Sequence, residues 1–322
     1  MLWLDILLLL LGLVLVVVGS DILVDGSSSI ARRLGVSEFV IGLTIVGMGT
    51  SAPEMVVSFI GAIKGSADIA VGNVIGSNIF NTLLILGVTS LILPIAISPT
   101  NRKRDIPINI AATLLLVIFG LAGGNILSRI DGAILLVLFI AYIVFSFLKD
   151  DKTIESEGSV KSRSIFLSIL LIIGGIAGLI IGGRLFVNYA TSIAQRAGVS
   201  DKFIAITILA GGTSLPELAT CIVAAFKKMG QLALGNIIGS NLFNILLILG
   251  GSALITPLSF TGMNPLDLGV LIVSSLFLLM AIFTGRNSRI GRGDGIAFTL
   301  LWALYMASLV YMVINPSFEI RF

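Results

Sequence analysis

The sequence predicts an all-α membrane protein in which ten transmembrane helices form two inverted five-helix repeats. Hydrophobic residues make up 57% of the 322 residues and charged residues only 11%, whereas a soluble domain carries about a quarter charged residues. Several apolar runs approach the length of about 20 residues that crosses a bilayer. In addition, two polar motifs occur twice in the chain, at a constant spacing.

The first motif, Gly-Thr-Ser-x-Pro-Glu, covers residues 49–54 and returns at 212–217. The second, Gly-Asn-x-x-Gly-Ser-Asn-x-x-Asn, covers 72–81 and returns at 235–244. The offset is 163 residues in both cases (217 − 54 and 244 − 81), so nothing is inserted or lost between the motifs. Each copy places a carboxylate among hydroxyls and amides in apolar surroundings. Because an acid at membrane depth is costly, its default interpretation is functional.

Apolar runs divide each half into five predicted spans. The first span begins near Leu2 and continues, with more polar residues, toward Arg33. A stretch of mixed charge at 149–163 separates the halves, so the predicted units are residues 1–148, a linker at 149–163, and residues 164–322. The polar motifs and their flanks occupy 47–81 and 210–244. The other predicted spans are 38–63, 69–93, 106–121 and 130–147, then 165–194, 203–226, 231–255, 266–283 and 295–314.

Lysine and arginine are distributed unequally between the two sides of these spans, with 14 on one side and 5 on the other. The positive-inside rule places the first group in the cytoplasm. Both termini are then extracellular and the linker cytoplasmic, in the plasma (inner) membrane. Because each half has an odd number of spans, the halves enter the membrane from opposite sides, as in many secondary transporters. The larger group is Arg32, Arg33, Arg102, Lys103, Arg104, Lys149, Lys152, Lys161, Arg163, Lys227, Lys228, Arg286, Arg289 and Arg292, and the smaller is Lys64, Arg129, Arg196, Lys202 and Arg321.

Composition also excludes several classes of function. The chain has one cysteine and no histidine, which rules out an intrachain disulfide, a histidine-ligated zinc site and a Ser-His enzyme. No paired aspartate motif suggests an aspartyl protease, and no basic surface interleaved with aromatic residues suggests nucleic-acid binding. Residues 1–18 lack a positively charged start and a small-residue cleavage site, so they are interpreted as a span and not a signal peptide. We therefore expect a non-enzymatic protein of the lipid bilayer.

The first motif predicts a broken helix with exposed oxygen atoms. Thr50 and Glu54 are four residues apart and would share a helical face. Pro53 has no N–H, so the carbonyl of Gly49 loses its partner within the helix. Irregular backbone is tolerated at membrane depth only beside protein or a water-filled cavity. Carbonyl, carboxylate and hydroxyl oxygens together form the ligand set that hard cations prefer. The second copy repeats this arrangement.

The second motif predicts a surface that packs against the first. Ser77 and Asn81 are four residues apart, as are Ser240 and Asn244. Its glycines form small-xxx-small patterns that allow close helix approach, and packing explains them better than ion binding. For the two asparagines, hydrogen bonds between helices are an alternative to ion binding. A duplicated fold whose halves only pack together would give no reason to repeat Glu, Ser and Asn within a span.

The two motifs, paired once per half, resemble the alpha repeats of the cation/calcium antiporter superfamily, and most closely its prokaryotic sodium/calcium exchanger branch. The resemblance covers essentially the whole chain. It implies exchange of Na⁺ for Ca²⁺ by alternating access, with these ions as transported ligands, no cofactor, and a monomer sufficient for transport. The implied ligands are the carboxylates of Glu54 and Glu217, oxygens of Thr50 and Thr213, the hydroxyls of Ser51, Ser77, Ser214 and Ser240, the backbone oxygens of Gly47 and Ala210, and Asn81 and Asn244 beside the middle position.

Two features of the motifs bear on ion selectivity. Some relatives carry Asp where this chain has Asn244, and in the potassium-dependent branch an acid there is associated with potassium co-transport. We therefore expect potassium independence. Gly47 stands where some relatives have a small residue with a methyl group. An H⁺/Ca²⁺ antiporter remains an alternative because glutamates can carry protons, although serine and carbonyl oxygens favour Na⁺. A passive cation channel is favoured less, because both motifs lie in one chain.

The electrostatics of two glutamates fit an exchanger. Two carboxylates about 6 Å apart repel by roughly 3 kcal/mol at an effective dielectric constant near 20, so an empty site should resist crossing the bilayer centre. Other acids have simpler expected roles. Asp21 and Asp25 occupy positions whose repeat equivalents are Arg184 and Asn188, and pairing, capping or an entrance vestibule is expected there. Capping or solvation is expected for Asp105, Asp131, Asp267 and Asp294 at span ends.

Overall fold

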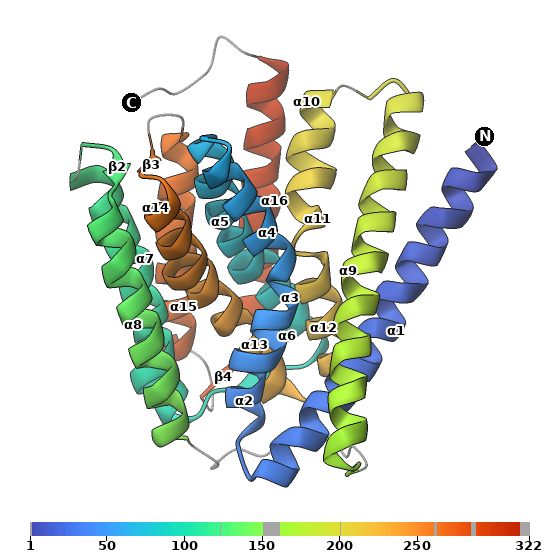
Figure 1. The fold of residues 1–322 in the computed structure, drawn as a ribbon, viewed down its shortest axis with the longest axis vertical. Coiled ribbons are helices and arrows are strands. Elements are labelled where there is room, and N and C mark those ends of the chain that lie inside the picture. The colour runs from blue at the N-terminus through green and yellow to red at the C-terminus, as the bar shows by residue number, and fades with distance from the viewer. Residues whose placement is uncertain are drawn as a thin grey trace.

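The computed structural model describes residues 2–122, 124–150, 162–199, 201–260, 263–284 and 288–315. Long helices stand side by side, and α16 ends at the same end of the molecule at which α1 begins (Figure 1). We call this the terminus end. The opposite end, where α8 ends and α9 begins, is the linker end. Most of the predicted linker, residues 151–161, lies outside the described residues.

Eight helices of the described chain are long and apolar enough to cross a membrane, and a bent pair brings the number to nine. This confirms an all-α membrane protein. The predicted span 203–226 is divided, and within it only α12 (Leu215–Phe226) is an apolar helix of ten residues or more. It follows α10 (Asp201–Ile204), η4 (Ala205–Leu209) and α11 (Ala210–Gly212). The bent pair joins α2 (Glu38–Ile41), η1 (Gly42–Val46) and α3 (Gly47–Thr50) to α4 (Ala52–Ile63).

The remaining spans agree with the predicted ranges to within three residues, except that η3–α7 begins five residues early, at Asn101 (106 − 101). They are α1 (Leu2–Leu34), α5–η2–α6 (Ala67–Ile79, Phe80–Ile85, Leu86–Ile92), η3–α7 (Asn101–Asp105, Ile106–Ala122), α8 (Arg129–Leu148), α9 (Ile165–Arg196), α13–η5–α14 (Gly230–Leu242, Phe243–Leu249, Gly250–Ile255), α15 (Pro265–Thr284) and α16 (Arg292–Ile314).

Wide π-helical turns interrupt all four motif-bearing spans. η1 and η4 begin 163 residues apart (205 − 42), as do η2 and η5 (243 − 80). A π turn inserts a residue into the regular hydrogen-bond ladder and is frequently found at functional sites. The repeat seen in the sequence therefore extends to the local backbone geometry.

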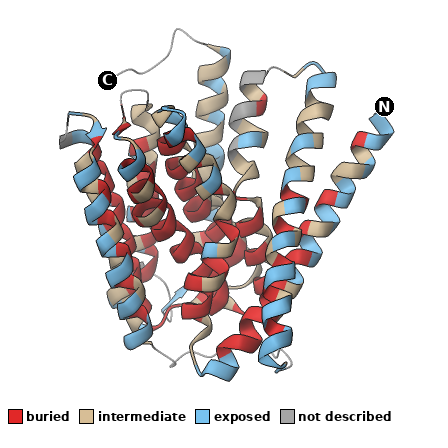
Figure 2. Cartoon of the chain, viewed as in Figure 1, coloured by how far each residue is buried: buried red, intermediate tan, exposed pale blue. Residues whose placement is uncertain are grey.

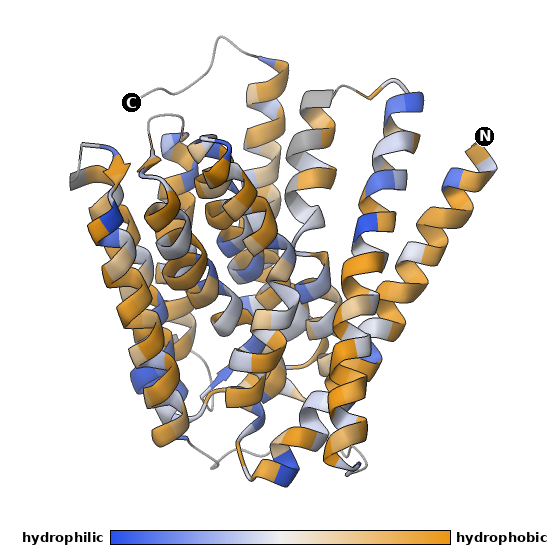
Figure 3. Ribbon diagram, viewed as in Figure 1, coloured by the Kyte–Doolittle hydropathy of each residue, from blue (hydrophilic) through white to orange (hydrophobic). Residues whose placement is uncertain are grey.

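The core lies around the second motif of each half. Within residues 230–255, 94% of the most apolar window is buried, against 6% within α16. Figure 2 shows the buried residues gathered inside the bundle, while α1, α8 and α9 present exposed outer faces. Most of α1, most of α8 and the half of α9 nearer the linker end are strongly hydrophobic (Figure 3), as expected for surfaces in contact with lipid.

Helices α1 and α9 pair closely through glycines. A Cβ atom on Gly19 would lie 2.9 Å from the carbonyl oxygen of Gly175, and one on Gly12 would lie 2.8 Å from that of Gly182. Both distances are too short for a real side chain, so only glycine allows this approach. Small residues at helix contacts commonly allow such close packing in membranes.

Short antiparallel ladders tie the two halves together at each end. β1 (Ile95–Ala96) pairs with β4 (Arg289–Ile290), and β2 (Ile126–Leu127) pairs with β3 (Leu258–Ser259). Basic residues of the larger predicted group meet at the linker end, where Arg33 donates to the carbonyl of Arg163. At the terminus end, Arg196 of the smaller group forms an ion pair of 3.1 Å with Asp5.

Candidate functional site

Both copies of the first motif break the helix beside their glutamate. Ser51 (φ −81°, ψ 8°) separates α3 from α4, and the two pieces are bent by 51°. In the second copy, Thr213 and Ser214 (φ −88°, ψ 7° at Ser214) separate α11 from α12. Each following helix carries a proline in its first turn, where a missing N–H costs no internal hydrogen bond. The break predicted from Pro53 is confirmed.

The two glutamates lie in the first turns of α4 and α12, and each is only 1% exposed. A helix N-terminus favours negative charge, which offsets part of the cost of burial. The remainder of that cost requires hydrogen bonds or a cation. Glu54 and Glu217 therefore occupy equivalent, buried positions beside the two breaks.

Each glutamate accepts a hydrogen bond from the serine of the other half. Ser51 Oγ donates to Glu217 Oε1 at 2.9 Å, and Ser214 Oγ donates to Glu54 Oε1 at 3.0 Å. Ser77 Oγ donates more weakly to Glu54 Oε1, at 3.4 Å. Because the first two bonds exchange partners between the halves, the two motifs face each other across an approximate two-fold relation.

The threonines of the first motif contact amides of the second. Thr50 Oγ1 lies 3.2 Å from Asn236 Oδ1, and Thr213 Oγ1 lies 3.4 Å from Asn73 Oδ1, each in hydrogen-bonding geometry. The sequence prediction named neither asparagine as a site residue. Both stand at the second position of a motif that repeats with constant offset, and that recurrence was the signal that could have found them.

A further set of amides joins α5 to α13 and η5. Asn244 Nδ2 donates to Asn78 Oδ1 at 2.9 Å, and Asn78 Nδ2 donates to the carbonyl of Asn241 at 3.2 Å. Asn241 Nδ2 donates in turn to Thr82 Oγ1 at 2.9 Å. Hydrogen bonding between helices, the alternative considered for Asn244, is therefore present, and it uses the amide nitrogen while leaving the amide oxygen available.

Several buried oxygens of the predicted site have no hydrogen-bond partner in the described part of the chain. Such atoms are rare in folded proteins, and each requires an explanation such as a bound ion. Carboxylate, hydroxyl and amide oxygens together suit a hard cation. The atoms are Glu54 Oε2, Glu217 Oε2, Ser240 Oγ, Asn81 Oδ1 and Asn244 Oδ1.

The two predicted backbone ligands are the carbonyl oxygens of Gly47 and Ala210. The carbonyl oxygen of Gly47 accepts the N–H of Ser51 at 3.0 Å and the hydroxyl of Thr50 at 3.4 Å. A carbonyl oxygen has two lone pairs, and these two hydrogen bonds occupy both of them. Ala210 lies at the start of α11, and its side chain is outside the described part of the structure.

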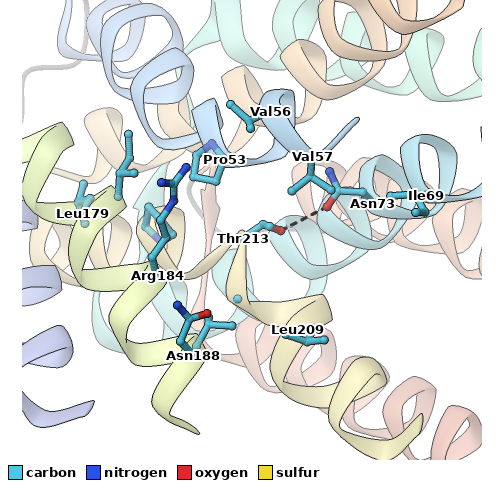
Figure 4. Close-up of a pocket in the computed structure, with 15 residues that line it drawn as sticks. Pro53, Val56, Val57, Ile69, Asn73, Leu179, Arg184, Asn188, Leu209 and Thr213 are labelled. Atoms are coloured by element: carbon cyan, nitrogen blue, oxygen red, sulfur yellow. Dashed lines mark hydrogen bonds between the residues drawn. The ribbon is translucent and has the colours of Figure 1, made fainter. Parts of the chain in front are cut away.

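A cavity of about 710 Å³ lies on the terminus side of the broken helices, and its lining includes the prolines that precede the two glutamates (Figure 4). Pro53, Pro216 and Thr213 form its inner wall next to the broken helices, and Asn73 lines it from α5. Thr213 reaches Asn73 across this wall in Figure 4. The other lining residues are Val56, Val57, Ile69, Leu179, Ile180, Gly183, Arg184, Val187, Asn188, Leu209 and Gly212.

Repeat-equivalent positions at the two ends differ sharply in exposure. Ile69 and Leu209, beside the cavity, are 52% and 47% exposed. Their equivalents, Leu232 (69 + 163) and Val46 (209 − 163), are both 0% exposed. Repeat-equivalent segments are therefore exposed where they lie toward the terminus end and packed where they lie toward the linker end.

The glycines of the second motif show the same difference. A Cβ on Gly235 would lie 2.8 Å from the backbone nitrogen of Leu43, and one on Gly239 would lie 2.8 Å from the Cα of Leu43. A Cβ on Gly72 or Gly76, the equivalent residues, would meet nothing within 4 Å. The packing role expected for these glycines is thus confirmed in the second half only.

The remaining acids vary in how well they match expectation. Asp131 and Asp294 bind the N–H groups at the starts of α8 and α16, at 2.8 Å each, as the capping interpretation predicts. Asp105 is 0% exposed and accepts a hydrogen bond from Tyr142 at 2.9 Å, and Asp267 accepts one from Tyr305 at 2.8 Å. Capping or solvation was the wrong interpretation for Asp105, because a tyrosine and Arg104 cover it.

At the linker end, Lys227 binds two of the acids of α1, Asp21 and Asp25. Its Nζ lies 2.6 Å from Asp25 Oδ1 and 2.8 Å from Asp21 Oδ1. Arg163 Nη2 lies 3.5 Å from the other oxygen of Asp25. The expected pairing of Asp21 and Asp25 is confirmed, and it connects α1 to the end of α12 and the start of α9.

Comparisons with known proteins agree with this geometry. A family model described as "Sodium/calcium exchanger protein" matches residues 4–148 and 167–311. A putative antiporter, CaxA of Alkalimonas amylolytica, is 41% identical over 89% of this chain and 92% of its own. The sodium/calcium exchanger MaX1 of Methanosarcina acetivorans is 35% identical over 97% of this chain and 100% of its own.

Among solved structures, the sodium-calcium exchanger NCX_Mj, soaked with Na⁺ and Ca²⁺, superposes with a TM-score of 0.83 at 37% identity, over 95% of this chain and 98% of its own. Family model, relatives and fold agree over nearly the whole length of the chain. The chain therefore belongs to the sodium/calcium exchanger family, in the prokaryotic branch of the cation/calcium antiporter superfamily.

Proposed function

We propose that this protein exchanges Na⁺ for Ca²⁺ across the plasma membrane by alternating access, independently of K⁺. One observation carries the proposal. Two buried glutamates from opposite halves each accept a hydrogen bond from a serine of the other half, and each keeps a second oxygen atom without a hydrogen-bond partner among the described residues. The relatives named for sodium/calcium exchange support the same ions.

In this proposal, Glu54 and Glu217 bind Ca²⁺ or Na⁺ in turn. Thr50 and Thr213 contribute oxygens next to them, and Asn81 and Asn244 border the central position. The flanking Na⁺ positions use Ser51, Ser77, Ser214 and Ser240, with backbone oxygens of Gly47 and Ala210. A Ca²⁺ ion would neutralise both carboxylates, as would two Na⁺ ions, so loaded forms cross between states more readily than the empty, doubly charged form.

The serine of each half bonds to the glutamate of the other, and these residues are related by the offset of 163. This reciprocal pairing supports an inverted repeat of ten spans. We infer that α10, η4, α11 and α12 together form the tenth. The clustering of basic residues at the linker end supports a cytoplasmic linker and extracellular termini under the positive-inside rule. In that orientation the cavity of about 710 Å³ lies on the extracellular side of the broken helices.

Proton coupling is the competing proposal. Paired glutamates could carry protons, and the printed name of CaxA specifies no ion. The serine hydroxyls favour Na⁺, because a proton carrier needs the carboxylates but not a ring of neutral oxygens. Potassium independence rests on Asn244, a neutral amide whose nitrogen already binds Asn78.

Uptake of ⁴⁵Ca²⁺ into proteoliposomes, with Na⁺, H⁺ and K⁺ gradients imposed separately, tests the proposal. We expect an outward Na⁺ gradient to drive uptake, and collapse of that gradient by a Na⁺ ionophore to stop it. An added K⁺ gradient should change nothing. Uptake that follows a pH gradient and ignores Na⁺ would overturn the proposal in favour of H⁺/Ca²⁺ exchange, and uptake without any counter-ion would favour a channel.

A further inference from the structure

We propose that Arg184 controls which cations reach the glutamates from the terminus end, disfavouring divalent ions more strongly than monovalent ones. The inference rests on the proposed function, because it assigns a selectivity residue to the same exchange. Arg184 lies at the entrance to the site and is not one of the proposed ion ligands.

Arg184 lies within α9, directly after the uncharged stretch 165–183 and 12 residues before the helix ends at Arg196 (196 − 184). An ionisable residue within a membrane-spanning helix faces a water-filled cavity or a charged partner, and it commonly marks a substrate pathway. Its side chain is exposed and lines the cavity, with the guanidinium extending toward Pro53 (Figure 4). Within the described part of the chain it forms no hydrogen bond or ion pair.

The cavity is the approach to the carboxylates from this end. Pro53 precedes Glu54, and Thr213 precedes Ser214, whose hydroxyl binds Glu54. Of the described residues that line the cavity, Arg184 alone carries a charge. A cation that enters here must therefore pass a fixed positive charge that no described acid neutralises.

A fixed charge acts on ions according to their valence. Its potential lowers the local concentration of each cation by a factor that is exponential in the ion's charge. The factor for Ca²⁺ is therefore the square of the factor for Na⁺. Arg184 thus favours the binding of Na⁺ over Ca²⁺ from the terminus end, whatever the intrinsic preference of the glutamates.

The other entrance has the opposite charge at the equivalent position. Asp21 is the repeat equivalent of Arg184 (184 − 163), and Asp25 is that of Asn188. Both acids bind Lys227 in this structure. If the linker end opens in the alternate state, acids and not a guanidinium would line its entrance, so the bias from Arg184 applies to one side of the membrane only.

The test compares Arg184→Gln, which removes the charge, with Arg184→Lys, which keeps it. Apparent KM values for ⁴⁵Ca²⁺ and ²²Na⁺ are measured from each side, in proteoliposomes of known orientation. For an ion about 10 Å from a unit charge in water, Arg184→Gln should lower the KM for Na⁺ about two-fold and that for Ca²⁺ about four-fold. Both changes should shrink as ionic strength rises, and Arg184→Lys should resemble the wild type.

Three results would overturn the proposal: an equal change in KM for both ions, the same change in Arg184→Lys, or a change for ions added at the linker end. These three results can be distinguished from a failure of the proposed function. If the proposed function is wrong, the wild-type protein itself will not couple Ca²⁺ transport to Na⁺. In that case the Ca²⁺ measurement and its salt dependence still test Arg184.

Discussion

The pairing of the two glutamates with serines at the centre of this molecule is symmetric, whereas its two entrances are not. Around the glutamates, Ser51 and Ser214 exchange partners between the halves with bond lengths of 2.9 and 3.0 Å. At the entrances, positions related by the same offset differ in charge, packing and exposure: Arg184 against Asp21, and Ile69 at 52% exposure against Leu232 at 0%.

This difference follows from what each region must do in an exchanger. A substrate ion approaches the centre from both sides in turn, so the same ligands must serve both states, and equivalent residues in the two halves preserve them. The entrances are used one at a time, so one is open while the other is packed. We infer that a single structure of an inverted repeat displays both packings, one in each half.

The largest expected effect comes from breaking the centre. Glu54→Gln and Glu217→Gln should each abolish Na⁺-driven ⁴⁵Ca²⁺ uptake, because removing one partner from a buried charged interaction costs about 3 to 5 kcal/mol, more than a hundred-fold in binding. Because Glu54 and Glu217 accept equivalent bonds from Ser214 and Ser51, both variants should lose activity to the same degree.

Asp68→Asn is the matched control, since it neutralises an exposed carboxylate at the start of α5. It should transport like the wild type, and all three variants should elute as folded protein in size-exclusion chromatography. Normal transport by either glutamine variant would remove that glutamate from the mechanism, and unequal losses would show that the centre is less symmetric in function than in structure.

An intermediate effect is expected from paired glycine substitutions in the two halves. Gly239→Ala places a Cβ against the backbone of Leu43 and should destabilise the fold by about 1 to 3 kcal/mol through overpacking. Gly76→Ala enters open space beside a cavity of about 60 Å³, so its thermal unfolding temperature should match that of the wild type. If the terminus end closes as the linker end is closed here, however, Gly76→Ala should slow exchange about ten-fold.

Thermal unfolding in detergent and uptake in liposomes separate these two consequences. Equal destabilisation by both substitutions would show that the first-half glycine is already packed. Wild-type transport by Gly76→Ala would show that α5 never reaches the packed arrangement that α13 has here, and alternating access by exchange of the two packings would then be wrong.

Sequence patterns predicted the spans, the helix break and the buried acids because these depend on local and repeated features. Apolar length predicted the spans, Pro53 predicted the break, and an acid within an apolar run marked Glu54. The crossed pairing of Ser51 with Glu217 was beyond prediction, since it depends on how the two breaks face each other. The supporting role of Asn73 was missed for the same reason.

The difference in packing between the two halves was even harder to predict from the sequence. The two copies of the second motif carry glycines at the same positions, yet only Gly235 and Gly239 are packed. Their environment depends on how the surrounding helices pack, which a repeated sequence does not encode. The sequence shows that the repeat-equivalent positions 21 and 184 carry Asp and Arg. Only the structure shows that Arg184 lines a cavity.

The smallest expected effect concerns the ion pairs that hold the linker end. Lys227 joins α12 to Asp21 and Asp25 of α1, and a partly exposed pair of this kind contributes up to about 1 kcal/mol. Asp25→Asn should therefore shift the population toward opening of the linker end by about five-fold or less. It should leave the carboxylates and their serines untouched.

Cysteine labelling measures this shift. In a Cys221→Ser background, which uses the residue found at the equivalent position 58, Leu232→Cys reports on the linker end and Ile69→Cys on the terminus end. Asp25→Asn should speed alkylation of the first and slow that of the second by a membrane-permeant maleimide in ion-free buffer. Faster labelling at both positions would indicate general loosening of the bundle. Unchanged labelling would mean that backbone packing around Gly235 and Gly239, and not the ion pairs, keeps the linker end closed.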